Sequence, residues 1–502
     1  MYCQLEYLAD CPPVGIQRAL DELPATLDET YERTLREIKD TNSEYARRLL
    51  LCVAVASRPL RVTELAETLA FDFVGPIPAF REECRLKNPV EAVLSTCSTL
   101  LSVVEYRGSR VMQFAHFSVK EFLTSTRFAE KRNTISGRYH ISMTPAHTVM
   151  TQLCLGMLLH LDRNITRNSL TRFPLAEYAA QHWFKHARFE GVSQNAEEGM
   201  KQLFDWTKPY LSIWIWIHDP TVYPFQPHIR GTPLHYAASC GLRDFAKILA
   251  TEYPKDVNSQ SFDDASTPLH LASRKGHIDL VQVLVGCGAD VSVQDKNGWT
   301  PLHWASDLGR EAMARTLVEC GADMSARDED GWAPLHRALD KGRVDVAQML
   351  VERGADVSAQ AKDGWTALHW ASSWGHVDMA RILVERGADV SAPAKHKWTP
   401  LHQALYFRHV DVARMLVERG ADVSAKADDG WTPLQLAFRN RYVDVAQMLI
   451  ERGAEGHLMQ FGDHYRATPP TGTRSVNPNS GLAYRRATVV YCDELDELED
   501  RM

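Results

Sequence analysis

A four-residue block, Thr-Pro-Leu-His or a close variant, recurs seven times in the second half of this 502-residue chain. The copies occupy residues 232–235, 267–270, 300–303, 333–336, 366–369, 399–402 and 432–435. The first interval is 35 residues and the next five are each 33 residues. Because each copy leads into a similar run of apolar residues, the regular period predicts stacked structural repeats rather than a single globular core.

Each unit is predicted to form two helices followed by a turn. In the third unit, Pro301 suits the first position of a helix, with Thr300 as its N-cap. Gly309 ends this helix, since a tight turn between helices requires a positive φ. In the next unit, Val346 and Leu350 are spaced for one face of a second helix. An Asn-Gly or Asp-Gly pair then predicts a hairpin turn between units.

The 33-residue period and the block T-P-L-H-x-A resemble the ankyrin repeat over residues 227–455. The resemblance implies a solenoid of seven repeats, each of which buries its apolar face against its neighbours. Repeats six and seven depart from the pattern, because Lys397, Arg408 and Arg441 replace turn glycines. Gln435 also replaces the last histidine of the series. A positive φ at a non-glycine residue costs about 1 kcal/mol, so we expect the C-terminal end to fray first or to act as a cap.

The N-terminal part of the chain predicts short helices followed by a β-hairpin. Helices are expected over residues 16–23, 27–39, 43–56, 64–69 and 88–97, and strands over 101–106 and 111–115. Thr63 is the predicted N-cap of the fourth helix, and Arg107-Gly108-Ser109 joins the strands. Helices followed by a two-stranded wing are typical of a winged-helix domain.

Several segments resemble fungal NACHT–ankyrin (NLR-like) proteins. They are Leu-Asp-Glu-Thr-Tyr-Glu-Arg at 27–33, Arg-Pro-Leu at 58–60, His-Phe-Ser-Val-Lys-Glu-Phe-Leu at 116–123 and Phe-Pro-Leu-Ala-Glu-Tyr at 173–178. In that family, such a stretch joins a nucleotide-binding switch domain to ankyrin repeats. The switch carries a phosphate-binding G-x-x-x-x-G-K-[ST] loop, whereas this sequence has no Gly-Lys pair. The resemblance therefore implies the C-terminal portion of such a protein, with the NTPase domain absent.

The same resemblance implies a non-catalytic function. We expect a protein–protein interaction module that recognises its partner with the concave ankyrin face, as the sensor or regulatory half of a NACHT-type signalling protein. One alternative is the C-terminal part of an NTP-hydrolysing switch whose catalytic domain lies upstream of Met1, with the winged helix contacting that domain. The other alternative is a stand-alone ankyrin adaptor.

We predict a mostly α-helical chain in five parts. Residues 1–40 form the helical end of a preceding domain, 41–128 a winged-helix-like domain, 129–226 a helical linker, 227–455 seven ankyrin repeats and 456–502 a disordered tail. The tail has an acidic end, because six of residues 491–500 are Asp or Glu. This end is either a solvated tail or a docking segment.

Charge and composition narrow the classes of partner. The net charge is −8, and the predicted third helix of the winged helix contains no Lys or Arg, which argues against nucleic-acid binding. No apolar run approaches the roughly 18 residues that span a membrane. The N-terminus does not resemble a signal peptide, and the ten cysteines form no C-x-x-C pair. These features predict an intracellular protein, cytoplasmic or nuclear, with protein partners.

Two sets of residues are the candidate partner-binding surface. One Trp directly precedes the block in each of the last five units: Trp299, Trp332, Trp365, Trp398 and Trp431. We expect these rings on the concave face, where Trp is frequent at binding hot spots. The ends of the first helices vary between units, as a surface adapted to a partner would: Asp307, Leu308, Asp340, Lys341, Ser373, Trp374, Tyr406 and Phe407. Alternatively, the indoles pack between units and the variation is drift on an exposed surface.

No residue pattern indicates catalysis. We expect the block histidines to hydrogen-bond the backbone between units rather than to bind metal. His182 and His186 are spaced for one helical face, but Trp183 stands where H-E-x-x-H motifs have Glu, and no third ligand is evident. We therefore predict no catalytic residue, no metal site and no cofactor.

Overall fold

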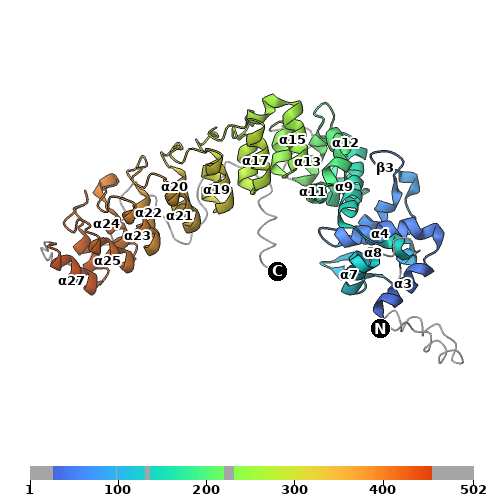
Figure 1. The fold of residues 1–502 in the computed structure, drawn as a ribbon, viewed down its shortest axis with the longest axis horizontal. Helices are drawn as coiled ribbons and strands as arrows, with labels where there is room; N and C mark the ends of the chain where they lie inside the picture. Colours follow the sequence, from blue (N-terminus) through green and yellow to red (C-terminus); the bar gives the residue numbers. More distant parts are fainter. Residues whose placement is uncertain (1–25, 98, 130–135, 220–230, 455–502) are drawn as a thin grey trace. The chain divides into compact units, whose positions relative to one another are not determined.

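The computed structural model of the chain describes residues 26–97, 99–129, 136–219 and 231–454. It divides into two compact units, residues 1–252 and 253–502 (Figure 1). The helix expected at residues 16–23, the domain boundary at residue 227 and the tail of residues 456–502 lie outside the described residues. Most of the described elements are helices, which confirms the mostly α-helical prediction.

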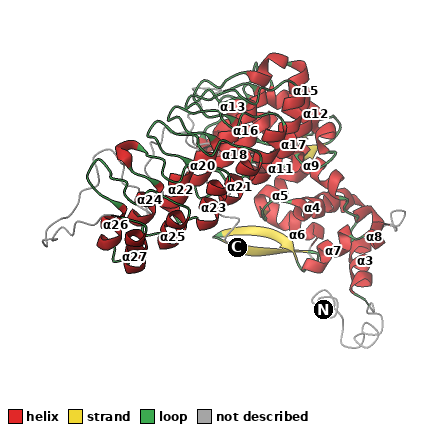
Figure 2. Cartoon of the chain, turned by 60° about the vertical axis from the view of Figure 1, so that its left-hand side comes forward, coloured by secondary structure: helices red, strands yellow, loops and turns green. Residues whose placement is uncertain are grey.

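A winged-helix domain forms the first part of the N-terminal unit. Its elements are α3 Leu27–Glu37, α4 Ser43–Val55, β1 Leu60–Arg61, α5 Val62–Glu67, β2 Phe71–Asp72, β3 Ala79–Phe80, α6 Pro89–Cys97, β4 Leu101–Tyr106, β5 Ser109–Phe114, α7 Phe117–Thr124 and α8 Thr126–Ala129. β4 and β5 form the predicted hairpin, and β1 extends it in the order β1-β5-β4 (Figure 2). The hydroxyls of Tyr31 and Ser118 share a hydrogen bond of 2.8 Å, so α3 packs on α7 within this domain.

The predicted N-cap at Thr63 is wrong. α5 begins at Val62, two residues before the predicted start at Glu64, and its N-cap is Arg61. The main-chain N–H of Arg61 donates to Glu64 Oε2 at 2.7 Å, and Arg58 donates two bonds of 2.8 Å to the same carboxylate. A buried carboxylate in the first turn therefore fixes the start of this helix, which a search for a capping hydroxyl misses.

Helices of the linker follow the winged helix in the same unit. They are α9 Met143–His160, α10 Arg167–Leu170, α11 Leu175–Ala187, α12 Val192–Phe204 and α13 Tyr210–His218. α9 packs on α11 and α12, and Tyr178 and Trp183 are fully buried. Several hydrogen bonds hold the linker on the winged helix. Among them, Ser57 N–H donates to Tyr178 Oη at 3.0 Å, and Leu175 N–H donates to Glu67 Oε2 at 2.7 Å.

The first ankyrin repeat completes the N-terminal unit. It consists of α14 Pro233–Ser239 and α15 Arg243–Glu252. Phe245 of α15 packs on Phe204 of α12 with ring centroids 5.2 Å apart, and Tyr236 of α14 lies edge-on to Trp214 of α13. The linker therefore buries an apolar face that the first repeat of a solenoid would otherwise leave exposed.

The C-terminal unit contains the other six repeats as pairs of helices. The pairs are α16 Pro268–Lys275 with α17 Ile278–Gly286, α18 Pro301–Asp307 with α19 Glu311–Glu319, α20 Pro334–Asp340 with α21 Val344–Glu352, α22 Ala367–Trp374 with α23 Val377–Glu385, α24 Pro400–Tyr406 with α25 Val410–Glu418, and α26 Pro433–Arg439 with α27 Val443–Glu451. The first helices of successive pairs stack in one layer and the second helices in another (Figures 1 and 2). As predicted, Thr300 is an N-cap, Pro301 follows it, and Gly309 has a positive φ of 71°.

The loops between repeats, here called fingers, differ from the expected hairpins. In the described part of the C-terminal unit they contain turns but no paired strands. Each finger instead bonds to the finger before it: Lys296 N–H donates to Asp264 O at 2.8 Å, and Glu329 N–H donates to Asn297 O at 3.1 Å. Bonds within a finger close its turn as well: Asp295 N–H donates to Trp299 O at 2.8 Å, and Gly298 N–H donates to Asp295 O at 2.9 Å. The fingers are thus held by bonds both within one repeat and between repeats.

The non-glycine turn residues adopt the predicted conformation. Lys397, Arg408 and Arg441 have φ values of 57°, 70° and 61°. Each therefore holds a left-handed backbone conformation that glycine adopts at lower cost. Whether the last repeats fray first stays a prediction.

Candidate protein-binding surface

The block histidines connect successive repeats, as predicted. In the third repeat, the Thr300 main-chain N–H donates to His303 Nδ1 at 3.1 Å. The opposite nitrogen, Nε2, therefore carries the proton, and it donates to the carbonyl oxygen of Trp332 in the next repeat at 3.0 Å. His270, His369 and His402 form the same pair of bonds, whereas the Nε2 of His336 donates to Ala359 O.

Burial keeps these imidazoles neutral. It lowers the pKa of His303, His336 and His369 to about 4, and it lowers the pKa of His270 and His402 in the same direction. A neutral ring has one donor and one acceptor, which is what the two bonds require. These histidines are structural elements of the scaffold on which the candidate surface rests.

The five candidate tryptophans lie at equivalent places in the fingers and are half-buried. Between the first two of them, the guanidinium of Arg337 lies 4.5 Å from the Trp299 ring and 4.3 Å from the Trp332 ring. Arg337 Nε also donates to the buried carboxylate of Asp328 at 2.9 Å. The cation is therefore held between two rings and a carboxylate of the same chain.

The row continues through a second inserted side chain. Trp370 occupies the place in its repeat that Arg337 occupies one repeat earlier. Its ring lies 4.9 Å from that of Trp332 and 4.3 Å from that of Trp365. At the N-terminal end of the row, Trp304 packs on Trp299 at 4.5 Å. The rings of Trp299, Trp332 and Trp365 thus pack against side chains of the same chain.

The last two tryptophans differ from the first three. The place of Arg337 and Trp370 is taken by Gln403 and Leu436 in repeats six and seven, so the row is interrupted there. Trp398 meets the edge of Tyr406 at 5.3 Å, and the Arg439 guanidinium lies 5.3 Å from the Trp431 ring. The sequence placed all five rings in one row, whereas the structure joins three of them.

The ends of the first helices expose apolar side chains at three repeats. Leu308, Trp374 and Tyr406 are each 37–38% exposed. Phe407 is half-buried with its ring edge-on to Tyr406, whereas Ser373 is buried and donates to the carbonyl oxygen of His369 at 2.9 Å. Of these candidates, Leu308, Trp374 and Tyr406 therefore have exposed apolar surface.

The charged candidates at the ends of the first helices belong to repeats three and four: Asp307, Asp340 and Lys341. Lys341 pairs with Asp340 at 3.1 Å on the surface. Asp307 is largely buried, and its Oδ1 has no hydrogen-bond partner among the described residues. Burial raises the pKa of the Asp307 carboxyl, while the nearby charge of Lys341 acts in the opposite direction. This carboxylate retains an unused acceptor next to the exposed Leu308.

The pair His182 and His186 lies in a buried cluster of the N-terminal unit. His186 Nε2 lies 2.9 Å from Tyr178 Oη, and His186 Nδ1 lies 2.9 Å from His147 Nδ1. Burial lowers the pKa of His182 and His186 to about 3. Within the described ranges, no group of three or more His, Cys, Asp or Glu side chains is arranged to hold a metal ion. The cluster is best explained as packing in the linker core.

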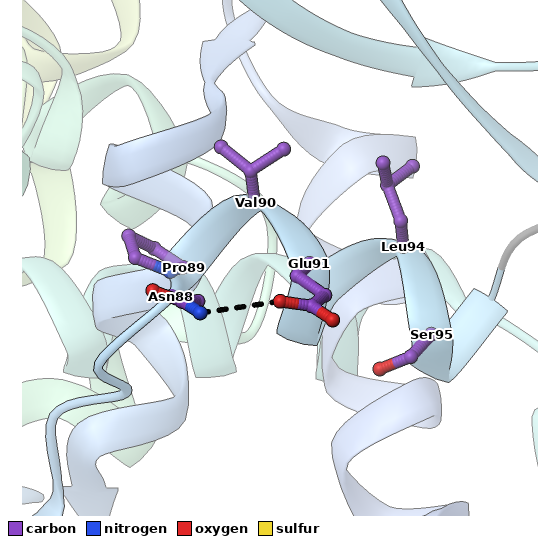
Figure 3. A pocket seen from close by; sticks show the side chains of 6 residues that line it. All are labelled: Asn88, Pro89, Val90, Glu91, Leu94 and Ser95. Atoms are coloured by element: carbon purple, nitrogen blue, oxygen red, sulfur yellow. Dashed lines mark hydrogen bonds between the residues drawn. The ribbon is translucent and has the colours of Figure 1, made fainter.

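A shallow hollow of about 630 Å³ lies beside α6 of the winged helix (Figure 3). Asn88, Pro89, Val90, Glu91, Leu94 and Ser95 line it. Asn88 Nδ2 donates to Glu91 Oε2 at 3.2 Å, which ties the two polar residues to each other (Figure 3). This side of α6 therefore presents a carboxylate, an amide, a hydroxyl and apolar groups.

The residue that follows each block histidine is the element that sequence reasoning missed. Trp304 Nε1 donates to Asp295 Oδ2 at 2.9 Å, as Arg337 does to Asp328. In both repeats the aspartate stands nine positions before the donor. An aspartate followed nine residues later by a side-chain donor is visible in the sequence, and it could have predicted which side chains insert between the tryptophans.

Family comparisons agree with both halves of this architecture. Overlapping segments between residues 218 and 460 match the family described as ankyrin repeats (3 copies). Residues 31–133 match the family described as GPI inositol-deacylase, winged helix domain. The predicted ankyrin solenoid and winged helix are therefore confirmed, and the ankyrin repeats make the C-terminal half a protein–protein interaction module.

Two curated proteins and one solved structure are similar to parts of the chain. Azaphilone pigments biosynthesis cluster protein L of Monascus ruber is 30% identical over 295 residues, which are 54% of this chain and 61% of that protein. Alpha-latrocrustotoxin-Lt1a of Latrodectus tredecimguttatus is 41% identical over 71 residues, which are 14% of this chain and 5% of that protein. The chain thus spans less than two thirds of the length of either relative.

The ankyrin repeat domain of Bcl-3 is 31% identical, with a TM-score of 0.40, and the match covers 43% of this chain and 98% of that one. Among the helices that the structure describes, none has the length and apolar character to cross a membrane.

Proposed function

We propose that the chain is a non-catalytic recognition protein that binds a protein partner on the concave ankyrin face, along the fingers and the ends of the first helices. The observation that carries this proposal is the exposure of apolar side chains at the ends of the first helices of repeats three, five and six. Leu308 and Trp374 occupy corresponding positions, and Tyr406 lies one position earlier in its repeat. Apolar side chains on a rigid scaffold bind with little loss of conformational entropy.

The test compares two full-length variants in a cross-linking capture experiment. The variant Leu308→Ala/Trp374→Ala/Tyr406→Ala should reduce capture of specific partners at least about tenfold, because truncation of hot-spot residues costs 1–4 kcal/mol or more. Trp206→Ala is the matched control, since Trp206 is also an exposed aromatic residue but lies in the linker. Equal capture by the triple variant and the control, with unchanged circular dichroism, would reject the proposed surface.

The tryptophan row needs a separate variant. Trp332→Ala/Trp365→Ala removes two rings that pack on Trp370. A loss of capture with an unchanged melting temperature would place these rings in the binding surface. Unchanged capture with lowered stability would instead assign them to packing between repeats.

We propose further that the module is the sensor or regulatory half of a NACHT-type signalling protein. The match to a winged-helix family and the family-like segments at residues 27–33 and 116–123 support this assignment. An immunoblot of the native protein, together with mapping of the 5′ end of its transcript, tests it against the two alternatives. A product well above 56.7 kDa that carries a P-loop supports the switch, and a product of 56.7 kDa supports the stand-alone adaptor.

A further inference from the structure

The last described repeat leaves its stacking surface uncovered. In repeat six, Leu405 and Val417 are 0% and 1% exposed, because repeat seven packs on them. The corresponding residues of repeat seven, Phe438 and Ile450, are 44% and 52% exposed, and Val443 is 73% exposed. A terminal repeat is normally polar on its outer face. We call the surface formed by Phe438, Val443 and Ile450 the terminal face.

Three arginines border the terminal face. Arg439, Arg441 and Arg452 each lie within two residues of one of its apolar members, and all three are exposed. No carboxylate of the described residues lies within ion-pair distance of any of them. The corresponding Arg419, one repeat earlier, pairs with Glu385 at 2.9 Å. Two exposed acids, Asp444 and Glu451, also lie next to Val443 and Ile450, so the border has a net charge of +1 from three arginines and two acids. Apolar groups beside unpaired guanidinium groups suit an acidic ligand that also carries apolar side chains.

We propose that the acidic segment at residues 491–500 of the same chain binds the terminal face and caps the solenoid. The segment holds six acidic residues, together with Tyr491, Leu495 and Leu498. These three apolar residues are spaced i, i+4 and i+7, which places them on one face if the segment forms a helix. An apolar stripe with acids around it matches the apolar centre and basic border of the terminal face.

Chain length and charge both favour this occupant. Repeat seven ends near Ala454, and only 36 residues, 455–490, separate it from the acidic segment. If residues 455–490 behave as a flexible linker, their root-mean-square span is about 30–36 Å, which holds the segment at an effective concentration near the millimolar range. A second copy of the chain would instead bring three further arginines against the first three.

The experiment is amide hydrogen exchange on the full-length chain. The tail variant Tyr491→Ser/Leu495→Ser/Leu498→Ser keeps every charge and changes no residue of the repeats. We expect it to raise exchange in α26 and α27 about tenfold, while α18 and α20 are unaffected. The charge variant Asp493→Lys/Glu494→Lys/Asp496→Lys/Glu497→Lys should have the same effect in low salt.

Reversing the charges on both sides of the proposed contact tests whether the tail and the arginines interact directly. Arg441→Glu/Arg452→Glu alone should also raise exchange in α27, and its combination with the lysine tail should restore protection. Arg381→Glu reverses an exposed arginine on α23 and should change nothing. Unchanged exchange in both tail variants would overturn the proposal. So would protection that rises with protein concentration and coincides with a dimer in sedimentation, since a second copy would then cover the terminal face.

Discussion

The imidazole of His303 donates a hydrogen bond of 3.0 Å from Nε2 to the main-chain carbonyl oxygen of Trp332, one repeat further along the solenoid. The histidine is fully buried and lies in α18, the first helix of the third repeat. The bond fixes the finger that carries the Trp332 ring, because it holds the carbonyl of the same residue. The stability of the solenoid and the position of Trp332 therefore both depend on the proton at Nε2 of His303.

This relationship predicts that the solenoid loses stability in mild acid. The folded-state pKa of His303, His336 and His369 is about 4, below the ordinary value of 6.5. Between these values the unfolded chain binds protons that the folded chain does not, so stability falls as the pH decreases from 6.5 towards 4. Each of these histidines contributes a loss of about 1.4 kcal/mol per pH unit in that range. Urea unfolding at pH 7.5, 6.0 and 5.0 measures the slope.

The matched control for the pH prediction comes from the last repeat. There, Gln435 Oε1 accepts the Thr432 N–H at 3.0 Å, so glutamine replaces the acceptor of the histidine without a titrating group. His303→Gln should therefore weaken the pH dependence between pH 6.5 and 4. An unaltered slope in His303→Gln would show that this ring is not part of the acid response.

Arg337 should be far more sensitive to truncation than to replacement by tryptophan. Arg337→Ala leaves the buried Asp328 carboxylate without its cation, and breaking a buried pair in this way costs about 3 kcal/mol or more. Arg337→Trp reproduces the neighbouring pair, in which Trp304 Nε1 donates to Asp295, and should cost less than about 1 kcal/mol. Chemical unfolding of both variants checks the difference. A similar loss in the two variants would mean that the ring faces, rather than the carboxylate, hold Arg337.

The sequence alone was sufficient for the repeats because their elements depend on local rules. Thr300, Pro301 and Gly309 determine a cap, a first turn and a stop within ten residues, and all three behave as predicted. The winged-helix hairpin was equally accessible, since alternation and a Gly turn specify it locally. The helix start at Val62 was missed because a buried carboxylate, rather than a hydroxyl residue, caps it.

The candidate surface was less predictable because it depends on contacts between repeats. The sequence showed a row of tryptophans, but whether their faces are free depends on the side chain inserted from the next repeat. Arg337 and Trp370 fill those spaces, and Gln403 does not provide a ring or cation at the corresponding place. The exposure of Trp374 and Tyr406 likewise depends on neighbours, so the identity of the residues alone could not give it.

A missing acceptor in repeat five provides a stabilising mutation. Trp370 Nε1 has no hydrogen-bond partner among the described residues, because Ala361 stands where repeats three and four have Asp295 and Asp328. Ala361→Asp should supply the acceptor.

The control for Ala361→Asp is Ala427→Asp, since Leu436 provides no donor at the corresponding place. The first variant should be more stable than the second by about 1.5 kcal/mol in urea unfolding, because a charged acceptor strengthens the bond. Equal stabilities would show that the indole N–H does not reach the new carboxylate.

Glycine at the strained turns should stabilise the last repeats specifically. Arg408 and Arg441 hold φ values of 70° and 61° at positions where Gly342 and Gly375 stand in earlier repeats. Arg408→Gly and Arg441→Gly should each raise the free energy of unfolding by about 1 kcal/mol, since glycine adopts this conformation without the Cβ clash. Arg414→Gly, in the middle of α25, is the opposite control and should lower the free energy of unfolding by about 1 kcal/mol.

If the C-terminal end frays first, hydrogen exchange in α26 and α27 should slow in Arg441→Gly before the global unfolding transition shifts. A shift of the global transition without slower local exchange would show instead that the last repeats unfold together with the rest of the solenoid.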